Sequence, residues 1–203
     1  MEITNLTVID MEKKSIKGTR TEHNLLASFA GESQARNRYT LFARQAVKEG
    51  YEQIASIFLT TADQELSHAQ QFFSYLEGGM VEIKAAYPAG VVADTKTNLA
   101  EAAAGEHEEW GELYANFADI AEEEGFPMIA LLYRNIAKVE KMHEERYLKL
   151  LERVSNGEVF SSEEPVRWYC RKCGYVVETK NAPKKCPVCG VDQGWFERFP
   201  DNY

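Results

Sequence analysis

Apolar residues recur at steps of three and four in four long stretches of the chain, a spacing that predicts amphipathic α-helices. Local signals indicate where these helices begin. Thr19-x-x-Glu22 has the form of a capping box at the first helix, and Asn98-x-x-Glu101 has the same form at the third. Pro127 suits the first turn of the fourth. We predict helices over residues 19–50, 51–78, 98–125 and 127–157.

The order of short and long connections predicts how these helices are joined. Short turns near Gly50 and Gly125 join the helices of each pair, whereas about 18 residues containing Pro88 and Gly90 link the second helix to the third. Two helical hairpins joined by one long crossover predict an all-α, ferritin-like four-helix bundle. We assign this bundle to residues 1–160, of which 1–18 are weakly patterned and predict a short strand-like or irregular arm.

Two of the apolar stripes contain acidic residues and histidines in the same pattern, Glu65-x-x-His68 and Glu140-x-x-His143. A Glu and the His three positions later share one helix face. The second helix presents the stripe Ile54, Phe58, Thr61, Glu65, His68, Phe72 and Tyr75, and the fourth presents Ile129, Tyr133, Ile136, Glu140, His143, Tyr147 and Leu150. An unpaired carboxylate on an apolar face is costly. Both pairs therefore predict metal ligands, with a buried structural ion pair as the alternative.

The two hairpins are an internal repeat with an offset of 75 residues. This offset aligns Tyr39 with Tyr114 and relates the two Glu-x-x-His patterns to each other, whereas Glu32 aligns with Glu106 at an offset of 74. The third helix therefore has one extra residue between Glu106 and Tyr114. We expect the bundle to have a pseudo-twofold axis and the extra residue to form a π-bulge, a feature frequent at functional sites.

The repeat brings one carboxylate from each remaining helix to the two Glu-x-x-His pairs. This is the ligand set of carboxylate-bridged di-iron bundles. Hard carboxylate oxygens suit Fe(III) and bridge two metals, whereas imidazole suits Fe(II). The predicted ligands are Glu32, Glu65, His68, Glu106, Glu140 and His143.

Three further residues are candidates for this site. Glu109 lies one turn after Glu106 and is either a fifth carboxylate ligand or a surface acid in an acidic run. Tyr39 and Tyr114 lie on inward stripes, where they either orient ligand carboxylates and exclude water or simply fill the core. His23 and His107 have no counterpart in the repeat and are predicted to lie at the surface.

Composition narrows the classes of partner. The formal net charge of −9 makes nucleic acid or an anionic membrane an unsuitable partner. No apolar run approaches the roughly 20 residues that span a bilayer, and residues 1–20 lack the pattern of a signal peptide, so we expect a cytoplasmic protein. Residues 166–203 contain seven basic and four acidic residues, a charge of +3, which leaves −12 on the remainder. Residues 161–165 are predicted to be a linker between two domains.

The small basic domain, residues 166–203, contains every cysteine of the chain. Cys170-x-x-Cys173 and Cys186-x-x-Cys189 are separated by 12 residues, a spacing typical of paired metal knuckles with four thiolate ligands. So short a segment cannot build an adequate core alone, and we expect the metal to supply much of its folding energy. The spacing permits either a structural zinc ribbon or an iron site that transfers single electrons.

These motifs resemble those of the rubrerythrin family over nearly the whole chain. The resemblance is carried by residues 31–35, 65–68, 105–109 and 140–143, and by a tail over 169–196 that is similar to rubredoxin. The two knuckles are closer together than in free-standing rubredoxins, which leaves the loop between them without a prediction. The resemblance implies a small rubredoxin-like β domain with one Fe bound by four cysteines, although zinc can replace that iron in a recombinant preparation.

The resemblance also implies a function. It implies a non-haem peroxidase that reduces hydrogen peroxide to water at two irons, in oxidative-stress defence, with electrons relayed through the four-cysteine iron from a reductase or a rubredoxin. It further implies that one iron binds Glu109 when oxidised and His68 when reduced. Because the tail follows the fourth helix at one end of the bundle, we predict a head-to-tail homodimer. The alternatives are a ferritin-like iron oxidase or store, which leaves the cysteines unused, and a zinc-ribbon interaction protein, which leaves the Glu-x-x-His repeat unused.

Overall fold

A computed structural model describes residues 14–200 of the chain. The arm predicted within residues 1–18 lies largely outside this range; of its described part, Ile16 is buried against the bundle. The helical part consists of α1 (Arg20–Lys48), α2 (Glu52–Ser74), α3 (Thr95–Glu108), a π-helical segment (Glu109–Leu113), α4 (Tyr114–Glu123) and α5 (Pro127–Asn156). The C-terminal part consists of β1 (Ser161–Cys170), β2 (Val176–Asn181), a 3₁₀ turn (Gln193–Trp195) and β3 (Phe196–Arg198).

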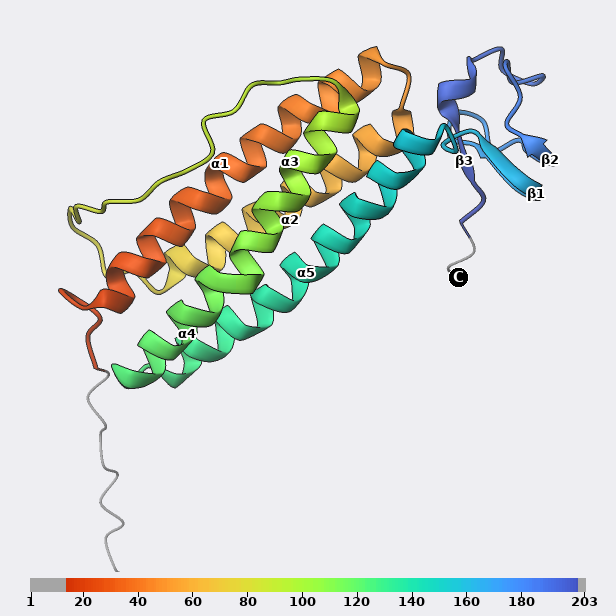
Figure 1. Cartoon of the computed structure of the whole chain (residues 1–203). Coiled ribbons are helices and arrows are strands. Elements are labelled where there is room, and N and C mark those ends of the chain that lie inside the picture. The colour runs from red at the N-terminus through yellow and green to blue at the C-terminus, as the bar shows by residue number, and fades with distance from the viewer. Residues whose placement is uncertain (1–13, 201–203) are drawn as a thin grey trace, which may run out of the picture.

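The helices form the predicted bundle. Helices α1 and α2 form one antiparallel hairpin, α3 with α4 pairs with α5 as the second, and the crossover runs along the length of the bundle between them (Figure 1). Within the hairpins, the chain turns at Gly50 and Gly125, whose positive φ values of 79° and 76° favour glycine. None of the described helices is long and apolar enough to span a membrane.

The helix ends agree with the sequence signals at α1 and differ at α2 and α3. The Thr19 side chain accepts a hydrogen bond from the N–H of Glu22 at 3.1 Å, as a capping box requires. Helix α2 ends at Ser74, before the predicted glycines. Helix α3 begins three residues earlier than predicted because Asp94, not Asn98, is its N-cap and accepts from Thr97 N–H at 2.7 Å. Asn98 instead bonds both backbone groups of Ala93 and thereby fixes the end of the crossover.

The extra residue of the third helix is accommodated as predicted. A π-helical segment occupies residues 109–113, between Glu106 and Tyr114, where the repeat offset changes from 74 to 75. Trp110 in this segment donates through its indole N–H to Glu144 on α5 at 2.6 Å. The bulge is therefore anchored to the neighbouring helix and turns the following tyrosine back into register with its counterpart in α1.

The core consists of two apolar clusters, one toward each end of the bundle. Each cluster presents a triad of aromatic rings to the middle of the bundle, and the repeat relates the two triads to each other at the offset of 75. Ring centroids lie 5.0–6.1 Å apart within the triads Tyr39–Phe58–Tyr147 and Tyr114–Tyr133–Phe72. The polar layer between these triads is thereby shielded from both ends.

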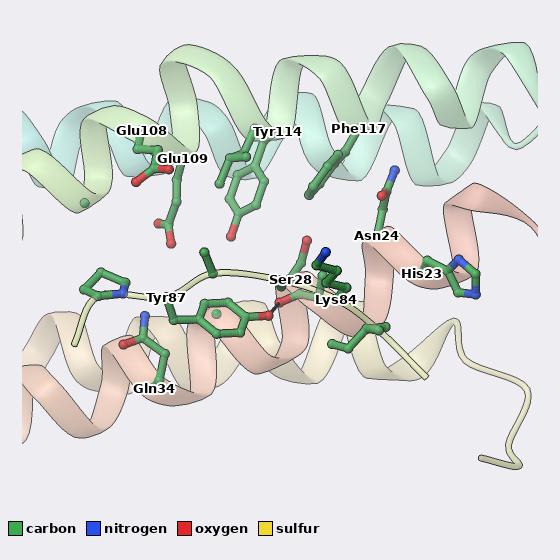
Figure 2. Close-up of a pocket in the computed structure, with 18 of the residues that line it drawn as sticks. His23, Asn24, Ser28, Gln34, Lys84, Tyr87, Glu108, Glu109, Tyr114 and Phe117 are labelled. Atoms are coloured by element: carbon green, nitrogen blue, oxygen red, sulfur yellow. Dashed lines mark hydrogen bonds between the residues drawn. The ribbon is translucent and has the colours of Figure 1, made fainter. Parts of the chain in front are cut away.

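The crossover after α2 crosses the outside of the bundle without helix or strand until Thr95. Tyr87, near its middle, donates from its hydroxyl to the backbone oxygen of Ala27 on α1 at 2.7 Å (Figure 2). This bond holds the crossover over the groove between α1 and the π-helical segment.

The C-terminal part is a three-stranded antiparallel sheet in the order β2-β1-β3. Residues 161–165, predicted to be a linker, begin β1 instead, and Ser161 pairs with Asn181 across an irregularity in the register. The module contacts the turn between α1 and α2: Tyr51 stacks on Phe160 with ring centroids 6.0 Å apart, and Gly194 lies against the backbone of Gly50.

Candidate metal centre

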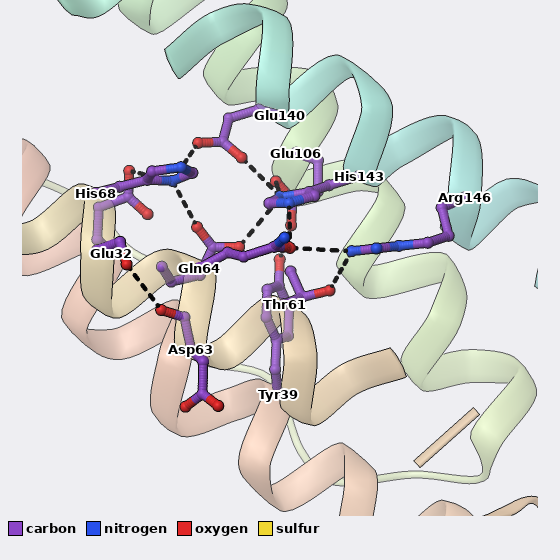
Figure 3. A network of polar contacts seen from close by, with 12 residues as sticks. Glu32, Tyr39, Thr61, Asp63, Gln64, His68, Glu106, Glu140, His143 and Arg146 are labelled. Carbon is purple, nitrogen blue, oxygen red and sulfur yellow. Dashed lines mark hydrogen bonds and ion pairs between the residues drawn. The ribbon is translucent and has the colours of Figure 1, made fainter. Parts of the chain in front are cut away.

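Six side chains from four helices converge in the polar layer between the aromatic triads (Figure 3). Five of them are fully buried, and His68 has 12% of its side chain exposed. They are Glu32 on α1, Glu65 and His68 on α2, Glu106 on α3, and Glu140 and His143 on α5. All six are the ligands predicted from the sequence, and they form two overlapping groups in which the ligand atoms lie within 4.8 Å of one another.

The two groups share two carboxylates. Glu140 places one oxygen 2.9 Å from His68 Nδ1 and the other 2.8 Å from His143 Nδ1. Glu65 spans the same two rings, with corresponding distances of 3.1 Å and 3.2 Å. Glu32 belongs only to the group with His68. Glu106 completes the other, so the layer contains two bridging and two terminal carboxylates.

Each terminal carboxylate accepts a hydrogen bond from a tyrosine of the other hairpin. Tyr39 donates to Glu106 and Tyr114 donates to Glu32, both at 2.6 Å. The two bonds are counterparts under the pseudo-twofold axis. Both hydroxyls therefore do more than fill the core, because each orients one carboxylate and satisfies one of its oxygens.

The electrostatics of the layer reflect its burial. Burial raises the pKa of Glu106 to about 8 and, together with the charges of Glu109 and Glu140, raises the pKa of Glu32 well above its usual range. Burial also opposes ionisation of Glu65, but its contacts with the two imidazoles outweigh this effect and lower its pKa to about 2. The cluster is thus an acidic centre that a pair of dications would neutralise.

The buried atoms that lack hydrogen bonds show that a metal pair fits this donor set. Among the described residues, six buried atoms of the cluster make no hydrogen bond, although all but the first of them lie 2.8–3.5 Å from an ion-pair partner: Glu32 Oε2, Glu65 Oε1, Glu106 Oε2, both carboxylate oxygens of Glu140, and His143 Nδ1. Buried polar atoms are rarely left unsatisfied. The carboxylate oxygens and imidazole nitrogens converge on two points. Divalent iron and manganese bind such ligands in carboxylate-rich helical bundles.

Glu109, the predicted extra ligand, lies beside this cluster and outside the two ligand groups. It is half-buried in the π-helical segment, and its carboxylate points into the space beneath the crossover (Figure 2). Its charge is the first among those of its neighbours in raising the pKa of Glu32. Glu109 is therefore adjacent to the His68 group, and its role as a ligand stays a prediction. His23 and His107 are exposed, as expected.

One set of polar residues around the cluster was not found from the sequence. Gln64 Oε1 lies 2.9 Å from His143 Nε2, and Arg146 donates to Thr61 Oγ1 at 2.6 Å and to Gln64 at 3.4 Å (Figure 3). Because Nδ1 of His143 faces the carboxylates, its Nε2–H is the donor to Gln64. The repeat places Val139 opposite Gln64, so symmetry offered no signal for this residue.

The four cysteines form the second centre. The Sγ atoms of Cys170 and Cys189 are 3.8 Å apart, and those of Cys173 and Cys186 are 3.6 Å apart, whereas a disulfide requires about 2 Å. A tetrahedral site with metal–sulfur bonds of about 2.3 Å has edges of about 3.8 Å. The predicted four-thiolate set is therefore already at metal-binding spacing.

Local backbone geometry creates this spacing. Each knuckle closes with a glycine at positive φ, Gly174 at 79° and Gly190 at 75°, whose N–H donates to the carbonyl of the first cysteine. Burial opposes ionisation of Cys186, but the N–H groups of Cys189 and Val188 contribute to lowering its pKa to about 6. Trp168 and Phe196, both fully buried, form the small core behind the metal site.

A ferritin-like bundle with paired carboxylate–histidine clusters, followed by a rubredoxin-like four-cysteine module, defines the class of this protein: a metal-binding oxidoreductase of the dimetal-carboxylate type. Comparison with known sequences gives the family. A family model described as rubrerythrin matches residues 23–151, and one described as the rubredoxin-like domain of rubrerythrin matches residues 168–197. The chain belongs to the rubrerythrin family. The family implies iron at both centres and an electron-donor partner.

Individual relatives agree with this assignment. The chain is 59% identical over 190 residues to a rubrerythrin from Porphyromonas gingivalis, a match covering 94% of this chain and 95% of that one. It is 51% identical over 190 residues to a rubrerythrin from Nitratidesulfovibrio vulgaris, covering 94% and 100%. Among solved structures, the partially reduced state of nigerythrin matches with a TM-score of 0.61 and 30% identity, covering 95% of this chain and 91% of that one.

Proposed function

We propose that this protein is a non-haem di-iron peroxidase that reduces hydrogen peroxide to water in oxidative-stress defence. The observation that carries this proposal is the pair of ligand groups sharing Glu65 and Glu140 in a chain that also contains a four-cysteine centre. Two adjacent ferrous ions in these groups would supply together the two electrons that the reaction H₂O₂ + 2e⁻ + 2H⁺ → 2H₂O consumes. A ferritin-like iron store would leave the four-cysteine centre without a task.

The residues around the ligand groups support this chemistry in two ways. Tyr39 and Tyr114 hold Glu106 and Glu32 in place through hydrogen bonds of 2.6 Å, so the terminal carboxylates are fixed before substrate arrives. The aromatic triads above and below the layer restrict the entry of water. A reactive oxygen species formed in this layer is therefore kept from the solvent.

His68 and Glu109 are alternative donors for one metal position. His68 is within 3.8 Å of Glu32 and, at 12%, is the most exposed ligand of the two bundle groups, while Glu109 approaches the same side from the π-helical segment. Carboxylate oxygen suits the ferric state and neutral imidazole the ferrous state. We assign Glu109 to the oxidised and His68 to the reduced protein, an exchange that leaves a position open for peroxide.

The four-cysteine centre relays single electrons in this proposal. Its iron would accept electrons from a reductase dependent on reduced nicotinamide or from a rubredoxin, and pass them on in two deliveries. The exposed second cysteine of each knuckle, Cys173 and Cys189, supports access for such a donor. A visible absorption spectrum of the purified protein separates iron from zinc at this site, because only the iron centre is strongly coloured.

The position of the tail supports a head-to-tail homodimer. The module lies beyond the end of α5 (Figure 1), and His143 lies 13 residues (156 − 143) before that end. At 1.5 Å per residue this separation is about 20 Å along the helix alone, which disfavours electron transfer within one chain. The basic tail, at +3, complements the acidic remainder, at −12, of a second chain.

The ligand assignment is tested by Glu65→Ala and Glu140→Ala. Each substitution removes a bridging carboxylate, so both bundle irons and peroxidase activity are expected to be lost while the four-cysteine iron keeps its visible spectrum. Two bundle irons with full activity in either variant would refute the site.

The dimer is tested with mixed dimers. One chain lacks Cys170 and Cys173, and the other lacks Glu65, so only transfer between chains can restore turnover. The proposal predicts activity in the mixed dimer. It is wrong if only a chain with both of its own centres intact turns over.

A further inference from the structure

A cavity of about 580 Å³ lies between α1, the π-helical segment, α4 and the crossover. Hydrogen peroxide has only two heavy atoms, and a water molecule occupies about 30 Å³ of liquid. The cavity is within the range of about 300–1,000 Å³ that is typical of sites for drug-sized ligands. Its size therefore exceeds what hydrogen peroxide requires by roughly an order of magnitude.

The inner end of this cavity is lined by residues that adjoin the carboxylate–histidine cluster. The Glu109 carboxylate and the Tyr114 hydroxyl both point into it (Figure 2), and that hydroxyl bonds Glu32 at 2.6 Å. Gly31 and Gly105, which precede the terminal ligands on α1 and α3, line the same space. A molecule in the cavity would therefore contact the residues that directly precede the two terminal carboxylates, one on α1 and one on α3.

The lining of the cavity is mixed. Charged side chains, among them Arg38, Glu82 and Lys84, line part of it. Apolar side chains of α1, the crossover, the π-helical segment and α4 line the rest and leave room on the crossover side: Ala27, Ala85, Ala86, Pro88, Leu113 and Phe117. Tyr87 closes this side, with its ring 3.5 Å from the position of a Cβ at Gly31 and its hydroxyl bonded to Ala27. The crossover over the cavity has neither helix nor strand, so widening it breaks no backbone ladder.

A cavity with an apolar section, and with Glu109 and Tyr114 at its end beside the proposed two-electron centre, suits a molecule with an apolar body and a polar, reducible end. We propose that the protein also reduces organic hydroperoxides, with the alkyl or aryl group held in this cavity and the O–O group directed toward Glu109 and Tyr114. This inference rests on the proposed peroxidase function. The O–O bond breaks, the reduced irons supply two electrons and the medium supplies two protons: ROOH + 2e⁻ + 2H⁺ → ROH + H₂O.

The experiment compares cumene hydroperoxide with hydrogen peroxide on the full-length, iron-loaded protein. The proposal predicts turnover of both. Ala86→Phe, which fills the cavity from the crossover, should lower kcat/KM for cumene hydroperoxide at least tenfold and leave that for hydrogen peroxide within about twofold. Ala27→Phe fills the same space from α1 and serves if the first variant does not fold. Val91→Phe, on an exposed part of the crossover outside the cavity, is the matched control and should change neither value.

A second readout does not depend on iron. Cumyl alcohol, the product, should bind the metal-free wild-type chain in ligand-observed NMR and lose that binding in Ala86→Phe. Reduction of hydrogen peroxide without cumene hydroperoxide, or equal effects of the variant on both substrates, would overturn this inference alone. Failure to reduce either peroxide would refute the proposed function and this inference with it.

Discussion

Replacing Gln64 with leucine should weaken metal binding at one of the two bundle positions. Gln64 accepts the only hydrogen bond of the described structure that involves His143 Nε2, at 2.9 Å, and His143 is fully buried. Leucine has nearly the same size but leaves this N–H without a partner, which costs about 1–3 kcal/mol. At about 1.4 kcal/mol per tenfold, the loss corresponds to about 10–100-fold in metal affinity, the range observed when a partner of a metal-bound histidine is removed.

The assay is an anaerobic competition titration of Fe(II) against a chelator, which resolves the two bundle positions. We expect the position containing His143 to weaken and the position containing His68 to remain within experimental error. Gln64→Glu retains an acceptor oxygen and should restore most of the affinity. Gln70→Leu, on the exposed face of the same helix, is the control for added apolar surface. Wild-type affinity at both positions in Gln64→Leu would refute the reasoning.

Three further predictions concern other parts of the molecule. In Gly194→Ala the added Cβ lies 2.9 Å from the carbonyl carbon of Gly50, so the tail module must shift. Calorimetry should show a free energy of unfolding lower by about 1–3 kcal/mol, with an unchanged four-cysteine spectrum. An unchanged Tm would contradict this contact. Burial raises the pKa of Glu124, but its bonds from Thr21 outweigh this effect and lower it to about 2. The stabilisation by the ionised Glu124 carboxylate is therefore present above pH ~4.5 and lost toward pH 2. Urea titrations should show Glu124→Gln about 1 kcal/mol less stable than the wild type at pH 7, a value discounted for the exposure of this side chain. The difference in stability should disappear in acid, and a difference independent of pH would contradict this prediction. Removal of the bundle metals should lower the bundle's Tm by roughly 15–30 °C, since two sites, each filled at a thousandfold excess over Kd, together contribute about 8 kcal/mol. Glu65→Ala, which we expect to bind neither metal, should show no metal-dependent shift in Tm.

The bundle and the convergence of the six predicted ligand side chains were predictable because several independent signals agree. Helical periodicity, the 75-residue repeat and the Glu-x-x-His spacing each place Glu65 and Glu140 on the inward face, and both are buried there. The one-residue change in offset before Tyr114 predicted the π-helical segment at 109–113, because an extra residue in a helix must be absorbed locally.

The structure differs from the sequence prediction where alternative local structures have similar energies, or where a residue's contacts come from a segment distant in sequence. Asp94 and Asn98 are both good N-cap residues, and an N-cap contributes only about 1 kcal/mol, so the sequence alone does not decide which of the two begins the helix. Residues 161–165 read as a polar linker, but they begin β1, because Ser161 before the irregularity and Val166 after it both pair with β2. Gln64 is a helix residue of ordinary propensity, and only the position of Arg146 and His143 in space gives it a role.

The central claim is that two irons in the bundle reduce peroxide together. The measurement is a stopped-flow and Mössbauer experiment on the anaerobically reduced, full-length protein mixed with one equivalent of hydrogen peroxide, and separately with oxygen. The account predicts that both bundle irons become ferric in one phase, that one peroxide is consumed per pair without trapped hydroxyl radical, and that peroxide reacts faster than oxygen. Stepwise oxidation with hydroxyl radical, or faster oxidation by oxygen with iron accumulating in the protein, would contradict it.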